Sequence, residues 1–428
     1  MAKYQKYAEY KDSGVEWLGE IPSHWKVVKL SYKLRLLSGD GITAFDIEDT
    51  GTYPVFGGNG LRGFTEKYNC DGEYALVGRQ GALCGNINVA RGKFFATEHA
   101  VVVYPYEKFN LTYLSEFLRF MDLGQYSVSA AQPGIAVDRI NALPIVTPTL
   151  DEQNSIGDFL DHETAKIDHL IEKQQQLIEL LKEKRQAVIS HAVTKGLNPN
   201  VPMKDSGVAW LGEVPEHWDV IYIKHLTEVK RGASPRPIDD PKYFDDEGEY
   251  AWTRIADVTK AGMYLTDTTQ KLSKLGSSLS VRLEPNELFL SIAGTVGKPC
   301  ITVFKACIHD GFVYFPTLKM NNKFLYYIFE AGQAYLGLGK MGTQLNLNTD
   351  TVGGIKIGLP PNFEIEQIIS YIETQNAKYD FLILTANKQV SLLQERRTAL
   401  ISAAVTGKID VRNWQAPSVT EADTELSA

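Results

Sequence analysis

Two glycine-rich stretches of the sequence carry side chains that can form paired hydrogen bonds to a planar partner. Arg, Asn and Gln are the side chains that read base edges in the major groove of DNA, and Lys contacts phosphates. In the first stretch the candidate DNA-binding residues are Arg62, Arg79, Gln80, Asn86, Asn88, Arg91 and Lys93, with Gln132 and Arg139 near its end. In the second stretch they are Arg231, Arg236, Arg254, Lys260, Lys271, Lys274 and Lys298, with Gln344 and Asn346 at the equivalent end. A single Lys or Arg is usually a solvated surface charge, so the prediction depends on each set as a whole.

Two other glycine-rich segments resemble catalytic loops but lack residues that the chemistry needs. Residues 56–60 (FGGNG) match the F-x-G-x-G loop of methyltransferases, but Pro54 stands two residues upstream and no N-P-P-[YF] tetrapeptide occurs. Residues 294–298 (GTVGK) lack the spacing of a phosphate-binding loop, and Pro299 replaces the hydroxyl that would bind magnesium. We therefore interpret both segments as turns, and we predict no catalytic residue and no cofactor on this chain.

The histidines and cysteines show no metal-binding pattern. The four cysteines include no C-x-x-C pair, and the eight histidines include no H-E-x-x-H motif, so no metal site is predicted. The N-terminal residues show no apolar signal segment, and no apolar run approaches the roughly 20 residues that cross a bilayer. We therefore expect a cytoplasmic protein with reduced thiols.

Composition limits the class of protein. The chain has 428 residues, of which 44% are hydrophobic and 11% aromatic, which is enough for folded cores. The formal net charge of −8 argues against a general polyanion-binding protein, which is normally basic. It does not exclude a local positive face on an otherwise acidic molecule.

Two segments of the sequence occur twice. Residues 11–25 (KDSGVEWLGEIPSHW) and 204–218 (KDSGVAWLGEVPEHW) are identical at 12 of 15 positions, with an offset of 193. Residues 180–194 and 392–406 are identical at 10 of 15 positions, with an offset of 212. A period near 200 residues is too long for a solenoid repeat, so it indicates duplication of whole domains.

The elements between these repeated segments are predicted to be short strands followed by a long helix. Alternating apolar residues broken by glycine turns predict strands at 74–77, 86–90 and 100–104, and again at 287–292, 300–304 and 311–315. The predicted fold class is α+β, with two mixed α/β domains in tandem and two long helices. The predicted boundaries are 1–150 for the first domain, 151–197 for the central helix, 198–361 for the second domain, 362–411 for the C-terminal helix and 412–428 for a flexible tail.

The long helices carry a heptad pattern. Residues 152–194 contain no proline and only one glycine, Gly157. Apolar residues sustained at 3.5-residue spacing favour coiled-coil pairing of the two helices, although each helix could instead pack only on its own domain. About 40 helical residues would make a rod about 60 Å long. The predicted pairing residues are Leu160, Ile167, Leu170, Leu177, Leu181 and Val188 in the first helix and Ile372, Tyr379, Leu382, Leu393 and Leu400 in the second.

Together these features resemble the specificity subunit of type I restriction–modification enzymes. The resemblance is carried by the PxHW segments, by DEQNSIGDFLDHETAKIDHLI with LLKEKRQAVISHAVTKG, and by FEIEQIISYIETQNAKYDFLI with LLQERRTALISAAVTGKI. It covers all but the first few and last dozen residues. It implies two target-recognition domains held apart by an antiparallel pair of helices with pseudo-twofold symmetry.

The resemblance also implies partners. They are double-stranded DNA, two copies of the modification (methyltransferase) subunit and the restriction (motor–nuclease) subunit, and S-adenosylmethionine, ATP and magnesium would be bound by those protein partners. We therefore expect a non-catalytic subunit that reads a bipartite, asymmetric site, with the helices setting the gap between its halves. The alternatives are a coiled-coil adaptor without a role at DNA, and a stand-alone DNA methyltransferase or nuclease.

Overall fold

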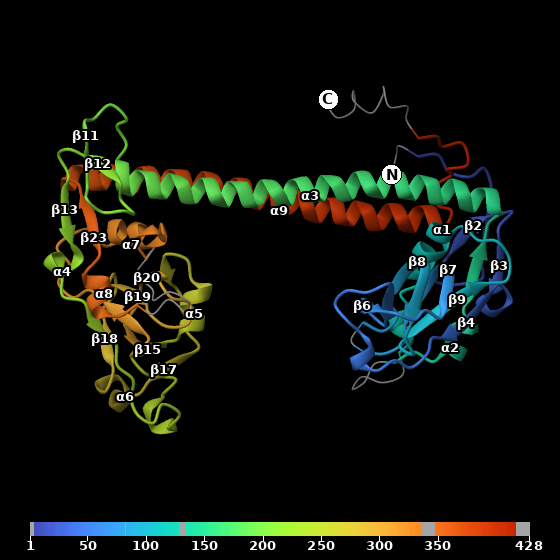
Figure 1. Cartoon of the computed structure of the whole chain (residues 1–428), viewed down its shortest axis with the longest axis horizontal. Coiled ribbons are helices and arrows are strands. Elements are labelled where there is room, and N and C mark those ends of the chain that lie inside the picture. The colour runs from blue at the N-terminus through green and yellow to red at the C-terminus, as the bar shows by residue number, and fades with distance from the viewer. Residues whose placement is uncertain (1–3, 82, 128–133, 336–346, 417–428) are drawn as a thin grey trace. The chain divides into compact units, whose positions relative to one another are not determined.

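A computed structural model of the chain describes residues 4–81, 83–127, 134–335 and 347–416 (Figure 1). The chain divides into two compact units. Unit 1 comprises residues 1–175 and 387–428, and unit 2 comprises residues 176–386. This division differs from the boundaries predicted from sequence, because each long helix is shared between the two units rather than standing apart from them.

The first unit is built mainly from short strands. Its strands are β1 (Tyr10–Asp12), β2 (Glu20–Pro22), β3 (Lys26–Lys29), β4 (Leu34–Ser38), β5 (Tyr53–Gly57), β6 (Gly60–Thr65), β7 (Cys70–Gly78), β8 (Ile87–Ala96), β9 (Ala100–Pro105) and β10 (Pro144–Thr147). Its short helices are η1 (Leu30–Tyr32), η2 (Ala44–Asp46), α1 (Leu111–Phe120), η3 (Leu123–Tyr126) and α2 (Val137–Asn141). Six strands form one sheet in the order β4-β9-β7-β8-β5-β6, and α1 packs on β7 and β8.

The second unit repeats this plan with an added sheet. Its strands are β11 (Met203–Asp205), β12 (Glu213–Pro215), β13 (Asp219–Tyr222), β14 (Lys230–Arg231), β15 (Tyr250–Thr253), β16 (Tyr264–Leu265), β17 (Gln270–Leu272), β18 (Val281–Leu283), β19 (Leu288–Ser291), β20 (Pro299–Thr302), β21 (Ala306–Ile308), β22 (Phe312–Tyr314) and β23 (Lys356–Leu359). Its short helices are α4 (Ile223–Leu226), η4 (Pro241–Tyr243), α5 (Ile255–Lys260), α6 (Lys274–Ser278), α7 (Asn322–Glu330), η5 (Gln333–Tyr335) and α8 (Thr349–Gly353).

The main sheets of the two units have corresponding strand orders. The order β14-β22-β19-β20-β16 in unit 2 matches β4-β9-β7-β8-β5 in unit 1, and in both sheets only the last of these pairs is parallel. A second sheet, β17-β15-β21-β18, is specific to unit 2. The strands predicted from sequence therefore correspond to β7, β8 and β9 and to β19, β20 and β22, and the extra residues of the second copy build additional structure.

The long helices are α3 (Leu150–Lys195) and α9 (Asn362–Val405). In unit 1 the start of α3 packs against the end of α9, because Leu160 lies in one apolar cluster with Leu400 and Val405. An ion pair joins Asp168 Oδ1 to Arg397 Nε at 2.8 Å. The beginning of one helix thus meets the end of the other.

Unit 2 pairs the opposite ends of the same helices. Ile189, near the end of α3, shares an apolar cluster with Ile368 and Ile372, near the start of α9. Arg185 Nη1 lies 2.7 Å from Asp380 Oδ1. Asp168 and Arg185 are as many residues apart on α3 as Asp380 and Arg397 are on α9. The two ion pairs therefore fit one antiparallel register of the helices.

The repeated KDSGVxWLGExPxHW segment has the same structure in both units. It forms the hairpin β1–β2 in one and β11–β12 in the other, and the Trp that ends it, Trp25 or Trp218, is fully buried. In unit 1, Lys408 beyond the end of α9 donates to the carbonyl oxygens of Leu18 and Glu20. Lys195, at the end of α3, makes the matching bonds in unit 2, so each hairpin closes the C-terminal end of a long helix.

Candidate nucleic-acid interface

The turn between β5 and β6 lies against two of the candidate residues of unit 1. A Cβ on Gly57 would lie 2.5 Å from Cδ of Arg62, and a Cβ on Gly60 would lie 3.0 Å from Oδ1 of Asn88. Gly60 also has a φ of 95°, a conformation that favours glycine, which accounts for this glycine of the FGGNG sequence. The Nδ2 atom of Asn88 is buried and has no hydrogen-bond partner among the described residues. Such an atom is uncommon in folded proteins, so Asn88 has hydrogen-bonding capacity that the described residues do not use.

The same turn adjoins the connection between β7 and β8. Asn86 Nδ2 donates to Asn59 Oδ1 at 3.4 Å. A Cβ on Gly58 would lie 3.1 Å from the carbonyl oxygen of His99 and 3.2 Å from that of Gln80. The structure therefore brings together candidates that are up to about 30 residues apart in the chain.

Arg79 connects this cluster to the neighbouring segments. Its Nη1 donates to Ser38 Oγ at 3.2 Å, and Gln80 forms an isolated bridge with Gly134. Arg139 follows on α2 and is exposed. We call the set Arg62, Arg79, Gln80, Asn86 and Asn88 the first polar cluster.

Arg91 and Lys93 lie away from that cluster. In the β7–β8 pair, Asp71 stands opposite Lys93 whereas Val77 stands opposite Ile87, so Lys93 is near the far end of the strands. Lys93 Nζ lies 4.7 Å from the ring centre of Tyr68, and Arg91 Nε lies 3.7 Å from Glu73 Oε1. The sequence set for unit 1 is thus divided in space.

In unit 2 the corresponding turn, between β19 and β20, packs on α5. Lys298 Nζ donates to the Thr259 carbonyl oxygen at 2.8 Å, and Thr259 Oγ1 lies 2.9 Å from Thr295 Oγ1. Arg254 and Lys260 lie at the two ends of α5 and are exposed. Lys298 lies in the turn that corresponds to the β7–β8 connection of unit 1, and Arg254 and Lys260 flank the helix that this turn contacts; we call these three cations the second polar cluster.

Arg231 and Arg236 gather around Asp310, a residue that sequence reasoning did not select. Arg231 Nε donates to the Asp310 carbonyl oxygen at 2.6 Å, and Arg236 Nη2 donates to Oδ2 at 2.9 Å. Ser234 donates to Oδ1 at 2.9 Å. Partial burial raises the pKa of Asp310, but the hydrogen bond from Ser234 and the charge of Arg236 outweigh it and hold the pKa below its ordinary value.

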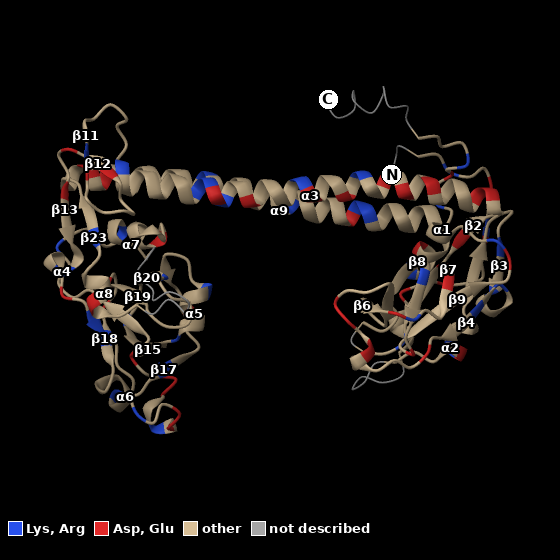
Figure 2. Cartoon of the chain, viewed as in Figure 1, with Lys and Arg blue, Asp and Glu red and all other residues tan. Residues whose placement is uncertain are grey.

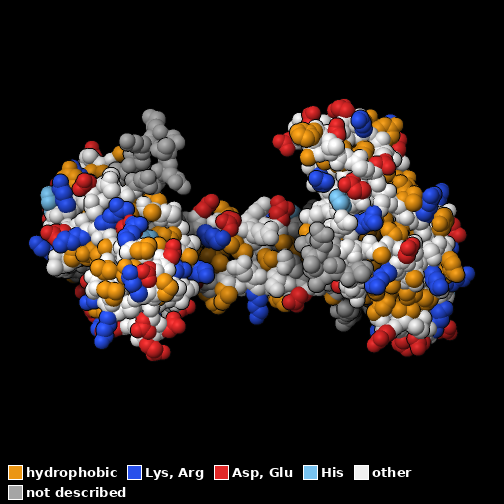
Figure 3. All heavy atoms as spheres, turned by 90° about the horizontal axis from the view of Figure 1, so that it is seen from below, with side chains coloured by type: hydrophobic (Ala, Val, Ile, Leu, Met, Phe, Trp, Pro, Cys, Tyr) orange, Lys and Arg blue, Asp and Glu red, His pale blue; other side chains and the backbone are white. Residues whose placement is uncertain are grey.

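The remaining candidates of unit 2 lie elsewhere or outside the described residues. Lys271 is on β17 and Lys274 on α6, both in the part of the unit formed around the added sheet. Gln132, Gln344 and Asn346 lie outside the residues that the structure describes. Lys and Arg side chains are distributed through both units rather than confined to one block, and in unit 2 many of them lie on the face seen in Figure 3 (Figures 2 and 3).

The predicted helix-pairing residues fall into two groups. All eight at the first heptad position are buried or half-buried, namely Leu160, Ile167, Leu181, Val188, Ile372, Tyr379, Leu393 and Leu400. Leu170, Leu177 and Leu382 differ from the expectation, since their exposed fractions are 43%, 43% and 37%. Ile171 and Ile178, one residue further along, turn inward instead. Because a leucine and an isoleucine are adjacent at both places, the sequence alone allows either one to face the other helix. The position of that helix determines which of the two is buried.

Four of the exposed leucines on the long helices form repeated pairs. Leu170 and Leu382 occupy equivalent positions in the two copies, as do Leu180 and Leu392, which are exposed by 56% and 45%. Unit 1 contains Leu170 and Leu392, and unit 2 contains Leu180 and Leu382. Each unit therefore contains one of these four leucines from each helix, and we call Leu170 with Leu392 and Leu180 with Leu382 the leucine pairs. The duplication in sequence was a signal that could have identified them.

Within the described ranges, no group of three or more His, Cys, Asp or Glu is placed to hold a metal ion. Of the helices that the structure describes, none has both the length and the apolar character that a membrane span requires.

Comparisons with known proteins agree with these features. The family model described as the type I restriction modification DNA specificity domain matches residues 22–180 and 215–390, one match in each half of the chain. The Escherichia coli protein named type I restriction enzyme EcoprrI specificity subunit is 42% identical over 162 residues, which are 37% of this chain and 40% of that protein. A Methanocaldococcus jannaschii protein, the putative MjaX specificity subunit, is 24% identical over 92% of this chain and 96% of its own length.

Solved structures show the same fold. One, from work on complex assembly and conformational transition of the type I restriction–modification system, has a TM-score of 0.69 over 90% of this chain and 98% of its own, at 14% identity. The specificity subunit of Thermoanaerobacter tengcongensis gives 0.51 over 91% and 98%, also at 14% identity. With a family match in both halves of the sequence and a duplicated fold that carries different polar clusters, the chain belongs to the family of type I restriction–modification DNA specificity subunits.

Proposed function

We propose that this chain is the DNA-recognition and scaffold subunit of a cytoplasmic type I restriction–modification complex, and that each of its units reads one half of a bipartite, asymmetric site. The observation that carries the proposal is that the two units share their framework of hairpin, sheet and helices but differ in their polar clusters. Both units share the hairpin, the sheet order and the helix pair, whereas the polar clusters at corresponding turns differ. Two readers with one framework and different contact residues suit two unlike half-sites.

The chemistry of the clusters supports direct readout of bases. The first polar cluster combines Arg79 and Arg62 with side-chain amides, which suit guanine and adenine respectively. The second polar cluster has Arg and Lys instead. A good bidentate contact contributes about 1–3 kcal/mol of discrimination against the wrong base, so a few such contacts in each unit are enough for a defined half-site.

The leucine pairs support two copies of one protein partner. Large apolar side chains exposed at equivalent places in both copies indicate a surface that another protein covers twice. We assign this surface to the modification subunit, which would also supply S-adenosylmethionine binding. ATP and magnesium would be bound by the restriction subunit, and the net charge of −8 suggests that the partners supply much of the contact with phosphates.

A domain exchange tests the proposal. Residues 26–150 are replaced by the corresponding region of another family member, and methylated adenines are mapped in cells carrying the complete system. We expect one half of the methylated sequence to change and the other half to stay the same. An unchanged methylated sequence would refute the assignment, and methylation of DNA by the purified chain alone would favour an enzyme instead.

A further inference from the structure

Asp310 in unit 2 receives hydrogen bonds from three side chains of one short segment. Arg231 reaches its backbone oxygen at 2.6 Å, whereas Ser234 and Arg236 donate to the two different carboxylate oxygens, each at 2.9 Å. The acceptor is separated from these donors by more than 70 residues of chain. One acidic residue therefore determines where two arginine side chains are held.

The segment that carries the arginines is itself fixed. Gly232 N donates to the Phe312 carbonyl oxygen at 2.9 Å, and Ala233 N donates to that of Ile308 at 3.1 Å. A Cβ on Gly232 would lie 2.1 Å from the His309 carbonyl oxygen, so the residue after Arg231 must be glycine. This close packing leaves the backbone beside Arg231 little freedom to move.

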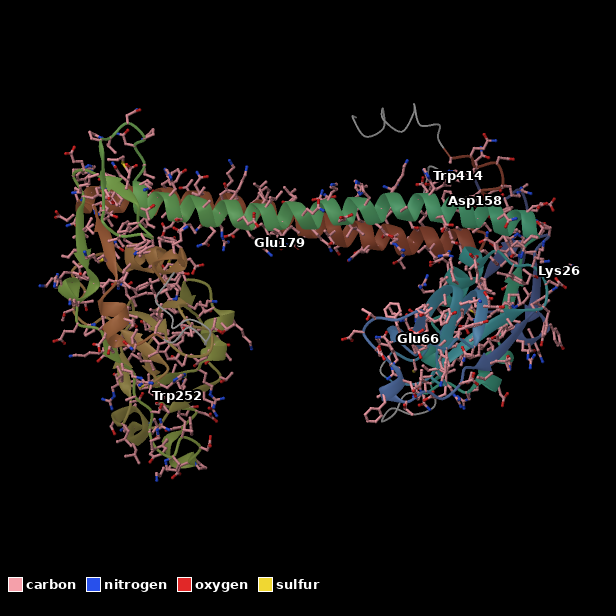
Figure 4. The ribbon with its side chains drawn as sticks, viewed as in Figure 1. Lys26, Glu66, Asp158, Glu179, Trp252 and Trp414 are labelled. Atoms are coloured by element: carbon pink, nitrogen blue, oxygen red, sulfur yellow. The ribbon has the colours of Figure 1, made fainter. Side chains whose placement is uncertain are left out.

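The acceptor side of the contact is equally well supported. The ring of His309 lies 4.5 Å from that of Phe312 and 5.9 Å from that of Trp252, and its Nδ1 accepts from Gly311 N at 2.8 Å. Trp252 lies on β15 in the globular part of unit 2, well away from the long helices (Figure 4). Asp310 thus follows a half-buried histidine that is packed among aromatic rings.

The anchoring leaves the guanidinium groups available to a ligand. Arg231 uses Nε for its contact, and its two terminal nitrogens make no hydrogen bond to the described residues. Those two nitrogens form the planar fork that matches O6 and N7 of guanine. Arg236 uses only Nη2, and 73% of its side chain is exposed. Fixing such side chains before binding reduces the entropy that is lost on contact.

The local charge favours a base edge over a phosphate. Asp310 is ionised at neutral pH and its side chain is 40% exposed, so it would repel a phosphate group that approached the same arginines. A guanine edge is neutral and presents two acceptors, so it meets less of this repulsion. The site also adjoins the second polar cluster, because Ile292 N, just before the β19–β20 turn, donates to the Gly311 carbonyl oxygen at 2.8 Å.

We propose that Asp310 is a positioning residue that holds Arg231 and Arg236 ready to read guanine in the half-site recognised by unit 2. The inference rests on the proposed function and adds a base identity, two readers and the residue that orients them.

The first test is Arg231→Lys in the complete complex. Lysine keeps the charge but cannot offer the planar fork, so we expect the preference for guanine at one position of one half-site, measured as a ratio of kcat/KM for methylation, to fall about 10- to 100-fold. Binding to DNA without the site would stay within about twofold. If the guanine preference were unchanged and only general binding weakened, Arg231 would be a phosphate contact and the proposal would be wrong.

The second test is Asp310→Asn. An amide is neutral, so Arg236 loses its charged partner and the hydrogen bond that remains is weaker, while the backbone anchor of Arg231 stays in place. We expect discrimination at a second guanine position to fall while binding to non-specific DNA rises, because a negative charge has been removed. A variant that failed to fold would instead show lower discrimination together with weaker binding to non-specific DNA. A variant with unaltered discrimination would overturn the positioning role.

Matched controls separate this inference from the proposed function. Glu249→Gln removes an exposed carboxylate from a different ion pair of unit 2, with Lys305, and should leave discrimination unchanged. In all three variants the half-site read by unit 1 should still be required for methylation. If neither half-site were required even by the unaltered complex, the proposed function itself would fail.

Discussion

Glu152 and Glu364 show how a duplicated residue can have different surroundings in its two copies. Both lie in the first turn of a long helix and bind the histidine of a PxHW segment, at 2.9 Å in each case. Glu152 also accepts from Trp25 Nε1 at 3.2 Å, whereas the Nε1 atom of Trp218 is buried without a partner among the described residues. The first copy therefore has the more complete hydrogen-bond network.

This difference predicts unequal effects on stability. Glu152→Gln should lower the free energy of unfolding by about 2 kcal/mol at pH 7, since hydrogen bonds to an ionised group are lost, and Glu364→Gln should have a smaller effect. Thermal unfolding of the matched variants measures both changes. Equal losses for the two variants would contradict the role given to Trp25.

The pH dependence of the Glu152 contribution has a definite sign. Burial raises the pKa of Glu152, but hydrogen bonds from His24 and Trp25 outweigh it and lower the pKa below its ordinary value of 4.5. A lowered carboxyl pKa stabilises the fold above the unfolded-state pKa, and this contribution is lost as the pH falls through the folded-state pKa. The difference in melting temperature between the native chain and Glu152→Gln should therefore narrow below about pH 4.5.

At the scale of elements, the long helices carry apolar residues both where they face each other and where they face solvent. The inward surface is the antiparallel pairing interface, and it includes Ile171 and Ile178. The outward one includes the leucine pairs, Leu170 with Leu392 and Leu180 with Leu382. A helix that packs only against its neighbour is expected to be apolar on that side and polar on the side that faces solvent.

Substitution of both leucines of one leucine pair should prevent one copy of the modification subunit from binding. We expect Leu170→Asp with Leu392→Asp to weaken binding of one modification subunit about 10- to 100-fold, because charge replaces apolar contact at the centre of a small surface. Native mass spectrometry of the complex would then show one modification subunit instead of two. Phe381→Asp is the control, because Phe381 is 67% exposed but its equivalent in the first copy is His169. An unchanged complex mass would show that the leucine pairs do not bind this partner.

At the scale of the whole molecule, the common register of the two ion pairs allows a length experiment. Deleting residues 172–178 from α3 and 384–390 from α9 removes one heptad from each helix and leaves both leucine pairs in place. Asp168 can still meet Arg397, and Arg185 can still meet Asp380, because equal lengths are lost between the two contacts. If the helices set the gap in the DNA site, both half-sites should persist with a gap about three base pairs shorter, since seven residues rise about 10 Å. Mapping of methylated adenines measures the gap, and an unaltered gap would contradict this role for the helices.

Much of the architecture could be predicted from local sequence patterns. Glycine turns and alternating residues predicted β7, β8 and β9, and the proline-free heptad stretch predicted α3, because these signals act over a few neighbouring residues. The added sheet β17-β15-β21-β18 was not predicted. Its strands have only three or four residues each and pair across long intervals, so their stability comes from tertiary packing rather than from local pattern.

By itself the sequence determined that the chain is duplicated, which parts are framework, and which side-chain types are available for contact with DNA. Only the tertiary structure decided that Arg62 and Asn88 both lie beside one turn while Arg91 and Lys93 lie elsewhere, and that Ile171 rather than Leu170 faces the partner helix. It also revealed Asp310, which lies 79 residues from Arg231 in the chain. The physical reason is that helix and strand patterns arise between neighbours in sequence, whereas a contact between distant residues depends on how whole elements pack.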